Sequence, residues 1–157
     1  MAADTLDPTI NDDLALAVNA SNQRMKPDIE NRADIDLLMM EFYSSAMVDD
    51  TIGYIFTDVA KLDLDHHLPI IGDFWETMLF QAGSYSQHGR NPLLVHAELS
   101  DKTPLTSLHF TRWHEIFTET IDRFFAGERA EFLKFRAAMM ANRMLDFIGA
   151  RTAEVAR

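Results

Sequence analysis

Two histidines on apolar segments are the residues of this sequence best suited to chemistry. His67 lies near the start of a helical pattern, and His96 lies in a short amphipathic segment between two loops. Leu93, His96 and Leu99 are three residues apart, so they can share one face of a helix. A neutral imidazole among aliphatic side chains is either an ordinary core residue or a metal ligand, and a lone histidine is far more often the former.

Several familiar kinds of site are missing from the sequence. There is no glycine-rich phosphate-binding loop, no His-Glu-x-x-His zinc motif and no Gly-x-Ser-x-Gly nucleophile elbow. A di-iron bundle needs paired Glu-x-x-His motifs, and not one is present. The chain has no cysteine, which excludes disulfides, thiolate zinc sites and thiol catalysis.

A haem iron fits the two histidines better than any of these sites. Haem needs a strong neutral ligand in an apolar slot, and His96 lies on the short segment that could present one. The other side needs apolar walls and donors for the negative charge that a diatomic ligand gains on ferrous iron. Tyr43, Trp113 and His67 are such donors on three predicted helices, and His66 competes for the role of His67. Without that context each would be an ordinary half-buried side chain.

The spacing of apolar residues predicts the elements that must position these side chains. Three- and four-residue steps indicate four long helices, with a short segment at 92–99 and a helical turn near 54–56. The long helices are expected at about residues 34–47, 65–81, 106–126 and 128–152. Asp34 is expected to cap the first, and Pro69 is tolerated near the start of the second. The chain is therefore predicted to be all-α.

The last predicted helix carries a stripe of phenylalanine and methionine, and Leu108 is expected on the buried side of the helix before it. Such a stripe more often packs in the hydrophobic core than against a cofactor. The residues expected to be buried include Phe132, Phe135, Met139, Met144 and Ile148, while Arg136, Arg143 and Arg151 are expected to face water.

Length and charge narrow the class of protein. The 157 residues suit one domain, expected at 33–157, after a polar extension at 1–32 that is partly ordered or flexible. Only residues 14–18 of that extension hint at a helix. A net charge of −11 argues against nucleic acid and against anionic lipid as partners. Neither a signal peptide nor a membrane-spanning stretch is visible, so a cytoplasmic protein is expected.

Short motifs follow one another in a specific order over about residues 34–125. They are Glu41-Phe42-Tyr43, Asp50-x-x-Gly53-x-Ile55-Phe56, His67-Leu68, Phe74-Trp75, Tyr85, Pro92-x-x-x-His96-x-x-Leu99 and His109-Phe110-x-Arg112-Trp113-x-x-Phe117-x-x-Thr120. Each motif is weak alone, but the ordered set is specific. It resembles the truncated haemoglobins, most closely their third group.

This resemblance implies a truncated globin-like, two-over-two helical sandwich around haem b (iron protoporphyrin IX). It implies that His96 is the proximal ligand of the iron, and that Tyr43, His67 and Trp113 are the distal polar residues. The haem pocket would be lined by Phe56, Leu68, Ile71, Phe74, Tyr85 and Arg90. For the haem propionates, the candidate partners are Arg90, Tyr85 and Arg112.

The sequence departs from the family pattern in three places. Leu64 stands where the family usually has tryptophan, and His114 replaces a usual leucine beside Trp113. The loop before Pro92 is longer than usual because of residues 86–90. The first two departures fall beside the expected distal side, and the third falls beside the segment that carries His96.

The resemblance implies binding of O₂ or another diatomic ligand, NO or CO. Three distal donors would hold O₂ too tightly for delivery, which favours redox chemistry or sensing over transport. Nitric oxide dioxygenase or peroxidase-like activity would then be expected, with a reductase as a candidate partner and a monomer or homodimer as the oligomeric state. The alternative from another class is an all-α interaction or regulatory module without a cofactor.

Overall fold

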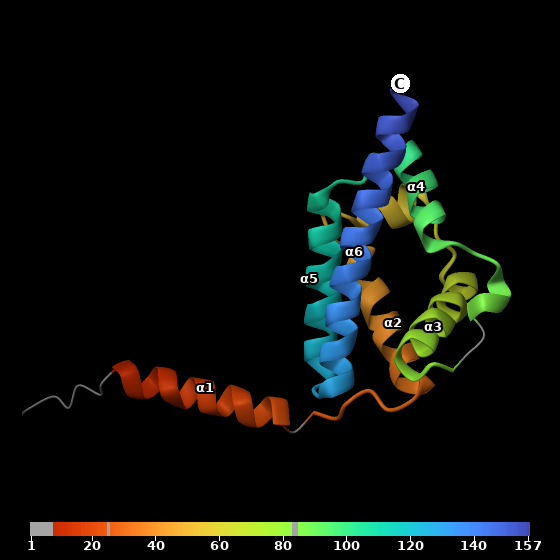
Figure 1. The fold of residues 1–157 in the computed structure, drawn as a ribbon. Coiled ribbons are helices and arrows are strands. Elements are labelled where there is room, and N and C mark those ends of the chain that lie inside the picture. The colour runs from red at the N-terminus through yellow and green to blue at the C-terminus, as the bar shows by residue number, and fades with distance from the viewer. Residues whose placement is uncertain (1–7, 25, 83–84) are drawn as a thin grey trace, which may run out of the picture.

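The structure is a computed structural model that describes residues 8–24, 26–82 and 85–157. All regular elements in these residues are helical, and no strand occurs among them (Figure 1). The predicted all-α fold class is therefore confirmed. None of the helices in the described ranges is long and apolar enough to cross a membrane.

The predicted long helices are all present, with ends shifted by a few residues. The helices are α1 (Pro8–Arg24), α2 (Arg32–Ala46), α3 (Leu64–Phe80), α4 (Pro92–Lys102), α5 (Ser107–Phe124) and α6 (Glu128–Val155). Two short elements join them, the π-helical turn η1 (Ile55–Val59) and the 3₁₀ turn η2 (Tyr85–His88). The turn expected near residues 54–56 is η1.

Two pairs of helices form the body of the molecule. α2 packs against α3, and α5 packs along α6 (Figure 1). The pairs meet where α2 packs against α5, and α4 packs against α6 beside them. The largest side chains that are almost wholly buried are Trp75, Phe42 and Phe117, one from each of α3, α2 and α5. Aromatic packing between the pairs therefore forms the centre of the core.

The start of α2 differs from the sequence-based expectation. Asn31, not Asp34, is the N-cap, because its side chain accepts a hydrogen bond from the backbone N–H of Asp34 at 3.1 Å. Asp34 accepts in return from the backbone N–H of Asn31, which completes a capping box. At α3 the cap is Asp63, so that helix begins within one residue of the predicted start, and Pro69 follows in its second turn.

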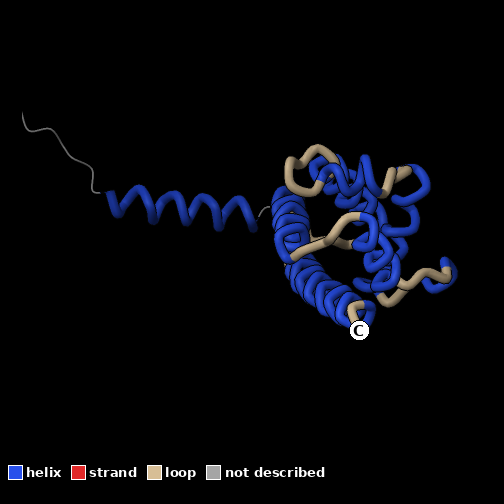
Figure 2. Tube along the Cα trace, turned by 90° about the horizontal axis from the view of Figure 1, so that it is seen from above, coloured by secondary structure: helices blue, strands red, loops and turns tan. Residues whose placement is uncertain are grey.

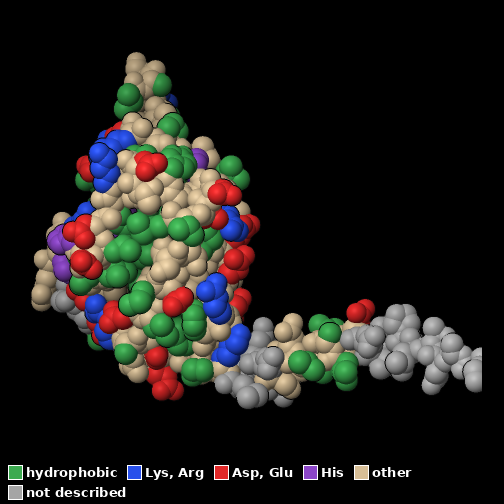
Figure 3. All heavy atoms as spheres, turned by 180° about the vertical axis from the view of Figure 1, so that it is seen from behind, with side chains coloured by type: hydrophobic (Ala, Val, Ile, Leu, Met, Phe, Trp, Pro, Cys, Tyr) green, Lys and Arg blue, Asp and Glu red, His purple; other side chains and the backbone are tan. Residues whose placement is uncertain are grey.

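The N-terminal helix α1 is longer than the short helix predicted at residues 14–18. It extends away from the helical body in both views (Figures 1 and 2), and Leu14, Leu16 and Val18 are exposed on it. The division of the chain into an extension at 1–32 and a domain at 33–157 stays a prediction. On the face shown in Figure 3, hydrophobic side chains gather over the middle of the helical body, and most acidic and basic side chains lie around them.

In the first half of α6 the buried face is not the face expected from its phenylalanines, whereas Met144 and Ile148 are buried as predicted. Phe132, Phe135 and Met139 are exposed, as is Leu108 on α5. The buried residues of α6 are Ala130, Leu133, Ala137, Ala141, Met144 and Ile148. Small side chains allow α5 and α4 to approach the α6 backbone closely, so the alanines lie inward although phenylalanine is more hydrophobic.

Candidate functional site

A cavity of about 770 Å³ lies among the helices of the body. Its walls come from α2, η1, α3, the segment before α4, α4, α5 and α6. Most of the lining side chains are aliphatic or aromatic, with a few polar groups among them. This volume and this mixture are typical of a site that encloses a cofactor or a small ligand.

His96 lines this cavity from α4 and is held by a contact to its own helix. Asn91 caps α4 by accepting from the backbone N–H of Leu93, and Pro92 occupies the first helical position. His96 Nδ1 lies 2.7 Å from the carbonyl oxygen of Pro92. Because a carbonyl can only accept, Nδ1 carries the proton, and Nε2 keeps a free lone pair. No hydrogen bond from another described residue reaches that Nε2.

The protonation of His96 follows from its surroundings. Burial lowers the pKa of His96, and the hydrogen bond to Pro92 offsets this only in part. The imidazole is therefore neutral at pH 7. A buried neutral imidazole whose other nitrogen donates to a backbone carbonyl is the arrangement that metal-ligating histidines commonly have.

Tyr43 and His67 line the same cavity and touch each other. Tyr43 comes from the buried face of α2, and His67 comes from the opening turn of α3. Tyr43 Oη lies 2.8 Å from His67 Nε2, and the two rings meet edge to face at 5.3 Å between centroids. The pair therefore presents two polar groups side by side on the wall of the cavity.

Both members of this pair are neutral. Burial raises the pKa of Tyr43 well above its ordinary value. Burial also lowers the pKa of His67 to about 4, with smaller contributions from the charges of Arg90, His96 and His66. At pH 7 the pair can thus share a neutral hydrogen bond and can offer hydrogen-bond donors without carrying net charge.

Trp113 lines the cavity from α5 within a stack of aromatic rings. Its indole lies on Phe117 at 5.3 Å with 10° between the ring planes, and Phe117 lies on Trp75 at 5.0 Å. Phe42 meets Trp113 edge-on at 5.9 Å. These contacts hold the indole in one plane. No hydrogen bond joins its N–H to another described residue.

Most of the predicted pocket residues line this cavity, but one does not. Phe56, Ile71, Phe74, Tyr85 and Arg90 are all among the lining residues. Leu68 instead lines a separate cavity of about 210 Å³ together with side chains of α2. Leu68 lies one turn before the buried Gly72, on the face of α3 that packs against α2, and this turns its side chain away from the larger cavity.

Arg112 also lies away from the cavity. Its Nε donates to Asp49 Oδ2 at 2.9 Å, and its Nη1 donates to Glu115 Oε2 at 3.1 Å. Arg112 therefore binds the turn that follows α2. It does not line the cavity, although it was a candidate partner for the haem propionates. Of the three predicted propionate partners, Arg90 and Tyr85 are the two that line the cavity.

Several polar residues at the cavity were not predicted from the sequence. Lys61, His88, Lys102 and His109 all line it. Lys61 lies in a left-handed backbone conformation at φ 47°, and His88 lies in the lengthened loop. Neither position follows from helical periodicity. His109 could have been suspected, because it precedes Trp113 by one helical turn.

The comparison with solved structures agrees with this geometry. The chain is similar to the crystal structure of a group III truncated haemoglobin from Campylobacter jejuni, with a TM-score of 0.68 and 28% sequence identity. The match covers 79% of this chain and 95% of the other. It confirms the truncated-globin fold and the resemblance to the third group. No protein-family model and no curated protein matches the chain.

Proposed function

We propose that this chain, which has the fold of a group III truncated haemoglobin, binds haem b in the large cavity through His96. The observation that carries the proposal is the state of His96, which is buried and neutral, with Nδ1–H on the carbonyl of Pro92 and Nε2 unused. Nε2 therefore has a free lone pair, and this is what a proximal histidine offers to a ferrous or ferric iron. The cavity is large and largely apolar, as a porphyrin requires.

The haem would supply an iron that binds O₂, NO or CO and exchanges electrons. Tyr43, His67 and Trp113 then serve as the distal polar residues. The pair Tyr43–His67 and the indole of Trp113 can donate hydrogen bonds to a ligand that gains negative charge. Because all three donors are neutral, they would stabilise a polarised ligand through hydrogen bonds and would add no positive charge of their own to the cavity.

Phe56, Ile71 and Phe74 would form apolar walls around the porphyrin, while Arg90 and Tyr85 would meet its propionates. The cavity wall holds Arg90 as a cation, and Lys61 and Lys102 are further cations in the same lining. Propionates are carboxylates and are best satisfied by charged donors.

The function that these donors favour is redox chemistry with O₂ or NO, or sensing of such a ligand, more than O₂ transport. Several distal donors slow ligand release, which suits a reaction at the iron better than delivery. Nitric oxide dioxygenation and peroxide chemistry are the two activities of this kind, and a reductase would be the partner that restores the ferrous iron.

Absorption spectra of the purified chain with one equivalent of haem test the proposal directly. A Soret band with a shifted maximum in the reduced and CO-bound forms is expected. Replacing His96→Gly should weaken haem binding, and added imidazole should restore the spectrum of the intact protein by supplying the missing nitrogen. A His96→Gly spectrum identical to that of the unchanged chain would show that another residue binds the iron. The absence of any Soret band would overturn the haem proposal as a whole.

A further inference from the structure

The segment that leads into α4 forms part of the wall of the cavity. Residues 85–91 carry Tyr85 and Arg90, which line the cavity, and end at Asn91, which caps α4. Within this segment η2 packs against α3, whereas α4 packs against α6. The segment therefore links the α2–α3 side of the cavity to the helix that carries His96.

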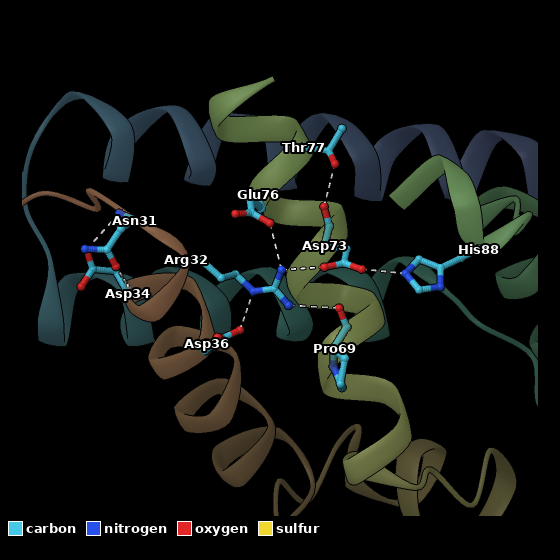
Figure 4. Close-up of polar contacts among 9 residues, drawn as sticks. All are labelled: Asn31, Arg32, Asp34, Asp36, Pro69, Asp73, Glu76, Thr77 and His88. Carbon is cyan, nitrogen blue, oxygen red and sulfur yellow. Dashed lines mark hydrogen bonds and ion pairs between the residues drawn. The ribbon is translucent and has the colours of Figure 1, made fainter. Parts of the chain in front are cut away.

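A polar contact fixes this segment to α3. His88 Nε2 lies 2.7 Å from Asp73 Oδ2, and this contact joins η2 to the middle of α3 (Figure 4). The side chain of His88 is 28% exposed and also lines the cavity, and the side chain of Asp73 is 16% exposed. Partial shielding from water makes such a contact stronger than an ion pair on the open surface.

Asp73 is itself held in place from α2. Arg32 Nη1 lies 2.5 Å from Asp73 Oδ1 and 2.9 Å from Glu76 Oε2, and Arg32 Nη2 donates to the carbonyl of Pro69 at 3.2 Å (Figure 4). A Cβ atom at Gly72 would come within 2.6 Å of Arg32 Nη2. The glycine thus leaves the space in which the guanidinium lies. The carboxylate of Asp73 is therefore oriented before His88 binds to it.

We propose that His88 is a haem-retaining residue and that Asp73 and Arg32 are its positioning residues. Bound to Asp73, His88 keeps residues 85–91 against α3, so that Tyr85 and Arg90 stay in the cavity wall and slow the escape of haem. The inference rests on the proposed haem binding. The inference concerns the rate at which haem leaves the protein. It assigns a role to the loop before Pro92, which is longer than in the family pattern.

Haem-transfer kinetics test this role in the full-length holoprotein. Loss of haem to an excess of a high-affinity apo-globin is measured for the unchanged chain, Asp73→Asn, His88→Ala and the double variant. Each single change should speed haem loss about three- to tenfold, the effect expected for one charge-assisted hydrogen bond. The double variant should lose haem no faster than the faster single variant, because both changes remove the same contact.

Glu76→Gln is the matched control. Glu76 lies on the same helix and binds the same atom of Arg32, but it does not touch His88. This variant should lose haem within about twofold of the unchanged rate. Equal acceleration by Glu76→Gln and Asp73→Asn would mean that general loosening of α3 causes the effect, and would overturn the inference.

The outcomes also separate this inference from the haem proposal. A normal Soret band with unchanged haem loss in His88→Ala would overturn the role of His88 alone. His88→Ala removes a partly exposed side chain, so it is expected to fold even if Asp73→Asn does not. Failure of the unchanged chain to bind haem would overturn both proposals, and this would be visible before any variant is made.

Discussion

Tyr43 Oη and His67 Nε2 lie 2.8 Å apart, and both groups are neutral at pH 7. One hydrogen atom lies between them, so one group must donate to the other. If His67 carries its proton on Nε2, it donates to Tyr43, and the tyrosine hydrogen is free to point into the cavity. If Tyr43 donates to His67 Nε2, the tyrosine hydrogen is used in this bond and the imidazole hydrogen lies on Nδ1 instead. The tautomer of His67 therefore sets how many donors the cavity offers.

Replacing Tyr43→Phe tests whether the tyrosine donates to the ligand. Loss of that donor should speed O₂ dissociation from the haem-bound protein about 10- to 100-fold, the cost of a hydrogen bond to a charged group. Stopped-flow displacement of O₂ by CO measures the rate. Tyr54→Phe is the control, because Tyr54 is more exposed and binds His109 outside this pair. An unchanged rate in Tyr43→Phe would mean that the hydroxyl hydrogen points to His67.

The low pKa of His67 predicts acid sensitivity of the haem-free chain. Its pKa is about 4 in the folded state and near 6.5 in the unfolded state. Between these two pH values His67 is protonated in the unfolded chain but not in the folded chain. Its contribution to the free energy of unfolding is therefore fully present above pH 6.5 and is lost as the pH drops toward 4. The total loss from this group is at most roughly 3 kcal/mol. Urea unfolding across this pH range measures it.

His67→Gln is the variant for this pH experiment. Glutamine can still bind Tyr43 but does not titrate, so the variant should lose less stability between pH 6.5 and 4. His96 remains in both chains, and its own titration therefore cancels in the comparison. Parallel stability curves for the two chains would contradict the assignment of this pH dependence to His67.

Asp49 predicts a second pH effect, at lower pH. Its side chain accepts from the backbone N–H groups of Thr51 and Ile52 at 3.0 and 3.2 Å and from Arg112. Burial alone would raise the pKa of Asp49, but Arg112 and these N–H groups together lower it. Asp49→Asn should therefore cost about 1–2 kcal/mol at pH 7. Because the folded-state pKa is depressed, this difference should shrink as the pH falls below about 3.8.

Unfolding of Asp49→Asn in urea at pH 7 and at pH 3 measures both parts of this expectation. Asp50→Asn is the control, since its side chain is the exposed neighbour of Asp49. A constant difference at both pH values would mean that the variant acts through packing and not through the charge of Asp49.

Much of the site could be predicted because it depends on local order along the chain. His96 follows Pro92 by one turn, and Tyr43, His67 and Trp113 each occupy the apolar face of a helix that periodicity identifies. The contact of His88 with Asp73 could not be predicted in this way. It joins a loop to a helix, and it depends on the path of an irregular segment, which no period describes.

The predicted buried face was wrong for the first half of α6, for a different reason, whereas Met144 and Ile148 are buried as predicted. Two faces of this helix are apolar, one rich in phenylalanine and methionine and the other rich in alanine. Hydrophobicity ranks Phe135 above Ala137, so the sequence pattern favours the aromatic face. The structure buries Ala137 instead, because close packing against neighbouring helices requires small side chains. The size of the side chains therefore decides which face of α6 packs inward, and the spacing of apolar residues carries no information about size.

Substitutions on the two faces of α6 test which one packs inward. Ala137 is completely buried, so Ala137→Leu should overpack the helix contacts and cost about 1–3 kcal/mol of unfolding free energy. Phe135 is 61% exposed, so Phe135→Ala should change stability by less than about 1 kcal/mol, against roughly 3–5 kcal/mol for a buried phenylalanine. Urea unfolding of both variants measures the contrast. A large loss in Phe135→Ala together with a tolerated Ala137→Leu would mean that the phenylalanine face, and not the alanine face, packs inward in this part of α6.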